Sequence, residues 1–137
     1  MPVFILYLTT NSGYTIVSIH PDGLLVGLGT STGTVRVYDI KAMSSVASFE
    51  GHEGSISGIS FSENGYFVSV TTKESKTFKV WDLRKLKCVG EVNIDAEGGK
   101  GLRSDFDFSA QYLGVSSGNS LQYVFCPRFN QHTMKFD

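Results

Sequence analysis

The chain has 137 residues, of which 41% are apolar and 12% aromatic, so it can bury a real core and its size suggests one domain. A formal net charge of −1 gives no electrostatic case for direct nucleic-acid binding, because dedicated binders usually present a strongly basic face. Cys88 and Cys126 have neither metal nor redox spacing and indicate free thiols in a reducing, intracellular compartment, with a single disulfide as the alternative.

The first eight residues, MPVFILYL, are apolar. They lack the basic start and small-residue cleavage site of a secretory signal, and they are too short to cross a membrane. We therefore expect a strand in this stretch and no membrane partner.

A first group of strands follows. Alternating apolar residues predict strands at 16–19, 24–29 and 35–39, and an outer strand at 46–49. His20-Pro21-Asp22-Gly23 separates the first two as a turn, because Asp and Gly favour turn conformations.

The second group is the clearest and spans Gly51 to Leu83. It opens with Gly-His, closes with Trp-Asp, and carries apolar residues along a first strand near 56–61. Glu63-Asn64-Gly65 is a turn, because Asn and Gly tolerate positive φ. Further strands are expected at 66–71, 77–81 and 88–92.

Two landmarks agree on one unit length. Tyr38-Asp39 stands where the second group has Trp81-Asp82, 43 residues later, and Gly23 and Gly65 lie 42 residues apart. Periods of about 40 to 45 residues are typical of four-stranded propeller blades. The sequence therefore predicts repeated sheets of one kind.

A third, weaker unit follows a polar, Gly-rich connection. Phe106 to Ala110 lines up with Phe61 to Gly65, and strands are expected at 103–108, 112–116 and 121–125. Val124 and Phe125 stand at the Trp-Asp position. Packing between neighbouring sheets can hold a repeat that lacks its signature residues.

Together these residues resemble the WD40 repeat, whose paired signature positions here are Gly51, His52, Trp81, Asp82, Tyr38 and Asp39. The resemblance implies an all-β fold of about three four-stranded antiparallel blades, part of a seven-bladed β-propeller. We expect one domain over 1–137, with blades near 14–50, 51–95 and 101–137.

The WD40 resemblance also implies a hydrogen-bonded network of the His, a second-strand hydroxyl, an Asp before the third strand, and the Trp. Ser75 occupies that Asp position, so we expect an incomplete network with His52 less firmly held. Trp81 should be largely buried, with its indole N–H bonded within the blade.

No catalytic, cofactor or metal site is expected. Gly98-Gly99-Lys100-Gly101 lacks the spacing of a phosphate loop, which makes it an inter-blade connection. No His is placed beside a nucleophile and an orienting acid in the sequence. Asp105 and Asp107 could share one face of a strand but have no third ligand nearby, which favours a solvated edge.

Two charged segments are candidate partner-binding surfaces. Arg84, Lys85 and Lys87 should lie in the turn between the third and fourth strands, either as a solvated turn or as a docking patch for an acidic protein or RNA segment. Lys73, Glu74 and Lys76 should lie at the opposite end of the blade, with Gly51 to Gly54.

A closer resemblance rests on three strings: HPDGL from His20, FSENGY from Phe61 and VWDLRKLK from Val80. In that order they look like later blades of the propeller of the pre-mRNA-processing factor nineteen family. The resemblance covers roughly residues 15 to 126. It implies a non-catalytic, nuclear, protein-binding propeller with spliceosomal or ubiquitin-pathway partners.

Two departures limit this resemblance. The sequence shows neither the U-box of that family nor its coiled-coil heptads, so ligase chemistry cannot be carried over to it. Tyr38 also replaces the first Trp. The alternative is a WD40 scaffold of an unrelated multiprotein complex.

Three blades are fewer than the four to eight that close a propeller. The end blades would then expose apolar faces that neighbouring blades should cover. We expect either a fragment of a longer propeller or self-association of copies through these open edges.

Overall fold

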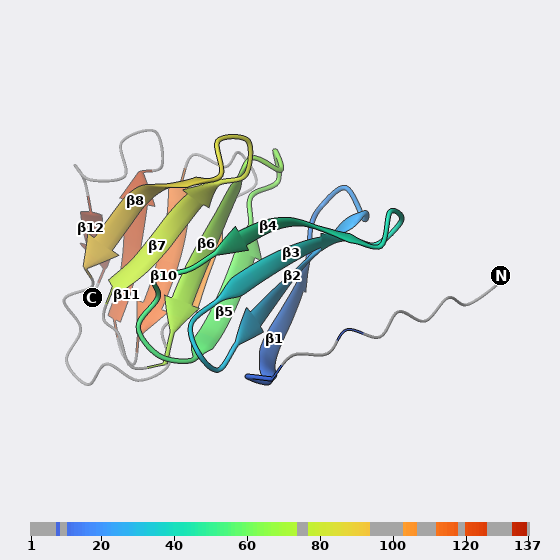
Figure 1. The fold of residues 1–137 in the computed structure, drawn as a ribbon. Helices are drawn as coiled ribbons and strands as arrows, with labels where there is room; N and C mark the ends of the chain where they lie inside the picture. Colours follow the sequence, from blue (N-terminus) through green and yellow to red (C-terminus); the bar gives the residue numbers. More distant parts are fainter. Residues whose placement is uncertain are drawn as a thin grey trace, which may run out of the picture.

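The computed structural model describes residue 8 and residues 11–73, 77–93, 103–106, 112–117, 120–125 and 133–136. The regular secondary structure of this part of the chain consists of strands, arranged in three four-stranded antiparallel sheets (Figure 1). Among the same residues no helix is long and apolar enough to cross a membrane.

Each sheet is a meander in which every strand pairs with its neighbour along the chain. The first sheet contains β1 (Tyr14–Ile19), β2 (Leu25–Thr30), β3 (Val35–Asp39) and β4 (Ser44–Phe49). The second contains β5 (Ile56–Phe61), β6 (Phe67–Thr72), β7 (Thr77–Asp82) and β8 (Lys87–Asn93). The third contains β9 (Arg103–Phe106), β10 (Tyr112–Ser117), β11 (Ser120–Phe125) and β12 (Thr133–Phe136). The strands expected between residues 15 and 125 are therefore confirmed, with shifts of one or two residues at most ends. The strand expected in residues 1–8 lies outside the described residues, apart from residue 8.

The first turns of the first two sheets have the same construction. Gly23 and Gly65 have positive φ values of 73° and 78°. The Gly23 N–H donates to the His20 carbonyl and the Gly65 N–H to the Ser62 carbonyl, each at 2.9 Å. Glycine takes this backbone conformation without the steric cost that a Cβ brings. The 42-residue spacing thus marks equivalent turns.

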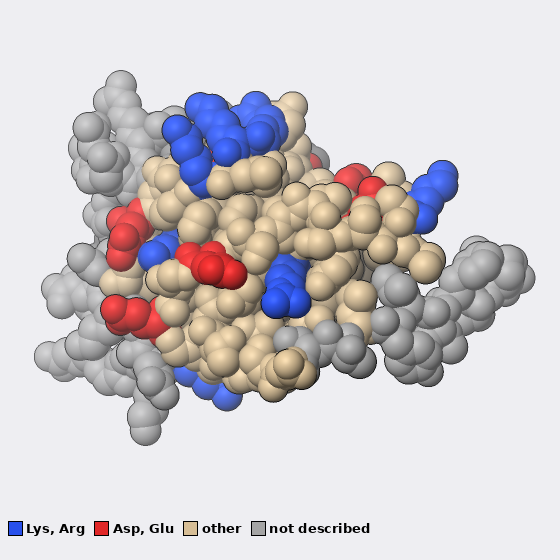
Figure 2. Space-filling view, in the orientation of Figure 1, with Lys and Arg blue, Asp and Glu red and all other residues tan. Residues whose placement is uncertain are grey.

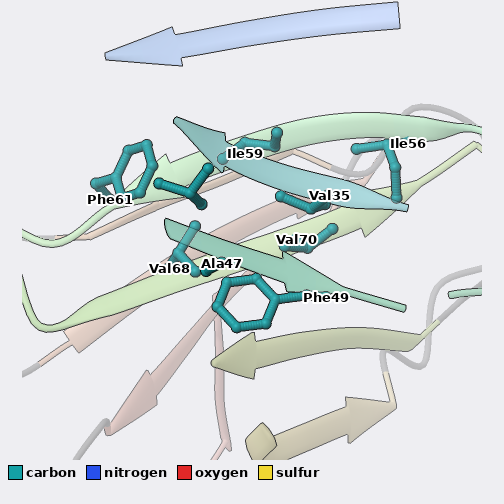
Figure 3. Close-up of a cluster of buried hydrophobic side chains, with 9 residues drawn as sticks. Val35, Ala47, Phe49, Ile56, Ile59, Phe61, Val68 and Val70 are labelled. Carbon is teal, nitrogen blue, oxygen red and sulfur yellow. The ribbon is translucent and has the colours of Figure 1, made fainter. Parts of the chain in front are cut away.

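The second sheet lies between the other two, with β5 in contact with both β1 and β9 (Figure 1). A continuous apolar cluster joins the first sheet to the second (Figure 3). Its buried members are Val35, Val37, Ala47, Phe49, Ile56, Ile59, Phe61, Val68 and Val70. Burial of this kind is the main driving force for stacking two sheets.

A smaller cluster joins the second sheet to the third. β7 alternates strictly, so that Phe78 and Val80 are fully buried while Thr77, Lys79 and Trp81 are partly buried. Phe78 and Val80 pack with Phe106, Leu113 and Val115 of the third sheet. Alternation with a period of two sends opposite faces of one strand to different neighbours. This packing holds the third sheet although it lacks the Trp-Asp pair.

Two glycines of β2 allow the first and second sheets to approach closely. A Cβ added to Gly27 would lie 2.9 Å from Cζ of Phe61, and one on Gly29 would lie 2.7 Å from Cβ of Ile56. Real Cβ atoms essentially never come this close to other heavy atoms. A larger residue at Gly27 or Gly29 would therefore push β5 away.

Candidate functional site

The repeat residues of the second sheet meet in a hydrogen-bonded pair. Trp81 Nε1 donates to His52 Nε2 at 3.1 Å, and the indole stacks on Phe49 with ring centroids 4.7 Å apart. Trp81 is mostly but not fully buried and packs against the apolar cluster between the first two sheets. The expected indole hydrogen bond within the sheet is confirmed, and the stack ties the same side chain to the first sheet.

His52 is held at both ring nitrogens. Its Nδ1 lies 2.8 Å from the carbonyl oxygen of Gly33, which can only accept, so Nδ1 carries the proton and Nε2 accepts from Trp81. Burial lowers the pKa of His52, the Gly33 contact opposes this, and the nearby Lys79 ammonium lowers it further. The neutral ring is the form that fits both contacts.

The hydroxyl link of the network is missing. Thr72 of β6 is 3% exposed, and its Oγ1 is buried with no hydrogen-bond partner among the described residues. Thr72 and His52 both line a cavity of about 90 Å³. The expected gap in the network was placed at Ser75, which lies outside the described residues, so that expectation stays a prediction. The Gly33 carbonyl gives His52 an anchor that the sequence did not indicate.

A second histidine links the first two sheets at their other end. His20 is 8% exposed, its Nε2 lies 2.9 Å from the carbonyl oxygen of Gly65, and its ring meets Phe61 edge to face. The Asp22 backbone N–H donates to His20 Nδ1 at 3.2 Å. Sequence reasoning placed His20 in a turn and missed this role. The equal spacing of the two turns was the available signal.

The aspartates of the two Tyr/Trp-Asp pairs organise the turns that follow them. Asp82 Oδ1 accepts the backbone N–H groups of Arg84 and Lys85 at 2.8 and 3.1 Å, and Asp39 Oδ1 does the same for Lys41 and Ala42. Burial alone would raise the pKa of Asp82, but these amides and the Arg84 guanidinium outweigh it, and the pKa is lowered. The aspartates therefore have a structural role in the repeat.

The Arg84 guanidinium has two further contacts. Nη2 lies 3.4 Å from Asp82 Oδ2, and Cζ lies 4.0 Å from the centre of the Tyr66 ring. The Arg84 side chain remains 55% exposed, and Lys85 and Lys87 are exposed beside it. The structure thus brings together the predicted cations of the β7–β8 turn and adds Tyr66, which sequence reasoning did not include.

The β3–β4 turn, which Asp39 caps, and the β7–β8 turn, which Asp82 caps, each hold an apolar residue in the left-handed region of φ. Met43 and Leu86 have φ values of 55° and are 71% and 55% exposed. The Leu86 N–H donates to the Asp82 carbonyl at 2.8 Å. Residues other than Gly, Asn and Asp seldom adopt this conformation.

The other predicted cluster is only partly described. Lys73 is exposed after β6, whereas Glu74, Ser75 and Lys76 lie outside the described residues. Lys79 reaches the same end of the sheet, where its Nζ donates to the Gly51 carbonyl at 2.9 Å. Nothing in the described part brings Lys73 together with the cations of the β7–β8 turn.

An open concavity of about 970 Å³ follows the inner strands β1, β5 and β9. Its described charged residues are Glu63 and Asp105, and Asp105 accepts a hydrogen bond from Ser60 Oγ at 3.1 Å. Asp107 and the 98–101 connection lie outside the described residues. Asp105 thus bridges neighbouring sheets, which explains a carboxylate on this strand without a metal.

In the described part of the chain, no three His, Cys, Asp or Glu residues are grouped to hold a metal ion. Both described histidine rings have their nitrogens occupied by the contacts given above. The one cysteine described, Cys88, is exposed with a free thiol.

Comparison with known proteins agrees with this geometry. The family model "WD domain, G-beta repeat" matches residues 43–82. The chain is 41% identical over 111 residues to pre-mRNA-processing factor 19 of Oryza sativa subsp. japonica, covering 81% of this chain and 21% of the relative. It is 40% identical to homolog 2 of that protein in Arabidopsis thaliana, covering 82% and 20%. The chain thus spans about a fifth of the curated relatives it matches.

Solved structures with a similar fold include a β-propeller domain, at low sequence identity. The β-propeller domain of Cps50 (Swd1) from Myceliophteria thermophila superposes with a TM-score of 0.77 at 17% identity, covering 94% of this chain and 38% of that one. The structure of U3-55K superposes with a TM-score of 0.79 at 11% identity, covering 93% and 40%. At such identities the likeness concerns the fold alone, which is that of a partial propeller.

Proposed function

Because this chain is a WD40 β-propeller segment that resembles pre-mRNA-processing factor 19, we propose that it is a non-catalytic protein-binding module of a pre-mRNA splicing assembly. The observation that carries the proposal is the similarity to relatives of that name across four-fifths of the chain. Splicing takes place in the nucleus, so a nuclear location follows from the same proposal. We include ubiquitin-pathway proteins among the proposed partners.

The geometry supports a binding role. Stacked sheets joined by two apolar clusters form a rigid body, and a rigid body presents its turns without an ordering cost on binding. The turns at one end of the second sheet expose Arg84, Lys85 and Lys87, and Lys73 is exposed at the other end. These exposed charged turns are therefore the candidate contact surfaces of the second sheet.

We also propose that the three sheets act as one partial-propeller domain, with blades near 14–50, 51–95 and 101–137. One face of β1 carries Val17 and Ile19, which are 61% and 69% exposed. Exposed apolar side chains of this size favour association. Self-association of the purified chain through this face is therefore part of the proposal, and light scattering over a range of concentrations tests it.

Affinity purification from nuclear extract tests the main proposal. The tagged chain is compared with an equally tagged, folded propeller of unrelated sequence, and bound proteins are identified by mass spectrometry. Specific enrichment of splicing proteins is expected. Recovery of one other reproducible assembly would favour the alternative, a WD40 scaffold of an unrelated complex. Recovery of the same proteins by both baits would overturn the splicing role.

A further inference from the structure

We propose that the β7–β8 turn and Tyr66 together form a binding site for an acidic peptide segment that also carries apolar side chains. The site consists of Tyr66, Arg84, Lys85, Leu86 and Lys87, and we call it the basic shelf. The inference deepens the proposed function, on which it rests, by naming the chemistry of a partner at one surface.

The first support is charge. Figure 2 shows Lys and Arg side chains gathered over the β7–β8 turn. Arg84, Lys85 and Lys87 are exposed, whereas the Asp82 side chain is only 3% exposed and one of its oxygens is taken by two backbone amides. Glu63 of the neighbouring turn adds one exposed carboxylate. The accessible charges of the shelf are therefore mainly positive, which attracts acidic segments.

The second support is preorganisation. The Arg84 guanidinium is already fixed by Asp82 Oδ2 at 3.4 Å and by the Tyr66 ring at 4.0 Å. The backbone of the two turns is joined by the Leu83 N–H, which donates to the Tyr66 carbonyl at 2.8 Å. A flexible side chain that is fixed before binding loses less conformational entropy when a carboxylate arrives. The planar guanidinium is also well suited to carboxylate oxygens.

The third support is the apolar residue among the cations. Leu86 is 55% exposed, and its positive φ is maintained by the hydrogen bond from its N–H to the Asp82 carbonyl. Leu86 thus stands between Lys85 and Lys87 on a backbone that is itself hydrogen-bonded. Leu86 thus gives the shelf an exposed apolar surface among its cations, which a peptide with apolar residues between acidic ones can cover.

These features favour a peptide over RNA. Single-stranded RNA is usually bound by stacking of bases on free aromatic rings. One face of Tyr66 is already covered by Arg84. The cations also occupy one short turn, whereas a strand of RNA needs a track of positive charge along its backbone.

The chain contains a matched turn for comparison. The β3–β4 turn has the same aspartate cap, at Asp39, and the same left-handed apolar residue, at Met43. It carries a single cation, Lys41. If the shelf binds through its charges, this second turn should contribute little although its backbone is equivalent.

The test uses fluorescence anisotropy with the purified chain and a labelled peptide of sequence Glu-Asp-Leu-Glu-Asp-Phe-Glu-Asp. Comparison ligands are the peptide with its acids replaced by Gln and Asn, the peptide with Leu and Phe replaced by Ser, and labelled oligouridine. The protein variants are Lys85→Glu/Lys87→Glu, Arg84→Lys and the matched control Lys41→Glu. Thermal melts establish that each variant is folded, and all of the altered side chains are exposed.

We expect the acidic peptide to bind and both altered peptides to bind more weakly. The double reversal should weaken binding about tenfold or more. Arg84→Lys should also weaken it, because a lysine cannot reproduce the fork over Tyr66, and Lys41→Glu should have little effect. Equal binding of the uncharged peptide, tighter binding of oligouridine, or an equal loss in Lys41→Glu would overturn the proposal.

Purification from nuclear extract with the double variant separates this inference from the proposed function. If the parent and the double variant recover the same splicing proteins and the peptide does not bind, the shelf is wrong and the function stands. If the parent recovers no splicing proteins, the function is wrong whatever the peptide does.

Discussion

The imidazole Nε2 of His20 in the first sheet lies 2.9 Å from the carbonyl oxygen of Gly65 in the second. The ring sits so close that a Cβ on Gly65 would lie 2.7 Å from His20 Cε1. Position 65, in the turn between β5 and β6, is thus closed to side chains for two reasons, the positive φ of Gly65 and the histidine against it.

Gly65→Ala should therefore destabilise the chain more than Gly23→Ala. Gly23 has nearly the same φ, 73° against 78°, but nothing lies within 4 Å of its added Cβ. Gly23→Ala should cost about 1 kcal/mol for backbone strain alone, and Gly65→Ala should cost about 1 to 3 kcal/mol more for the clash. Urea unfolding of both variants measures the difference. Equal losses would show that His20 moves aside freely.

Removal of the Trp81 side chain should separate its hydrogen bond from its packing. Trp81→Phe keeps the stack on Phe49 but leaves His52 Nε2 unpaired, which should cost about 1 to 2 kcal/mol. Trp81→Ala also loses the aromatic contact and should cost about 3 kcal/mol, at the low end for large core deletions because the indole is only partly buried. Denaturant unfolding compares the two. A melting temperature for Trp81→Ala within about two degrees of that of the parent would contradict a structural role for Trp81.

Stability should fall in mildly acidic solution because of His52. Its pKa in the folded chain is lowered from the ordinary 6.5, so the unfolded chain takes up the proton first. The contribution of neutral His52 to the free energy of unfolding is complete above about pH 6.5, and it is lost as the pH falls from there toward the pKa of His52 in the folded chain. His52→Gln should show a flatter profile between about pH 7.5 and about pH 5.5, because its amide can still contact Gly33 and Trp81 without titrating. Identical slopes for parent and variant would exclude His52 as the cause.

The two capping aspartates should differ in importance. Asp82 is 2% exposed and Asp39 is half-buried, although both accept two backbone N–H groups. Asp82→Ala should cost about 2 to 3 kcal/mol, because it leaves two backbone amides unpaired in a part-buried setting. Asp39→Ala should cost about 1 kcal/mol, since water can replace the carboxylate. Chemical denaturation of the two variants measures the difference. A larger loss of unfolding free energy for Asp39→Ala than for Asp82→Ala would contradict this prediction.

The parts of the fold that depend on local chemistry could be predicted from the sequence. Strand alternation at Phe78 and Val80 and the turn glycines Gly23 and Gly65 each act over a few residues, so their positions were correct. The period of 43 between Tyr38 and Trp81 further indicated that the sheets were of one kind.

Contacts between sheets could not be predicted in the same way. His52 reaches Gly33, and His20 reaches Gly65, over 19 and 45 residues of chain. A polar contact of this length leaves no periodic pattern in the sequence, and each histidine had a plausible local role. Tyr66 was missed at the basic shelf for the same reason, because its ring meets Arg84 only when two turns lie side by side.

The two histidine contacts lie at opposite ends of the same pair of sheets. His20 joins the turns after β1 and β5, and His52 joins the loop before β5 to the turn after β2. One contact would leave the first sheet free to rotate against the second, but two contacts at a distance prevent rotation as well as sliding. A force applied to β1 is then transmitted to the second sheet, and the two sheets should unfold together under force.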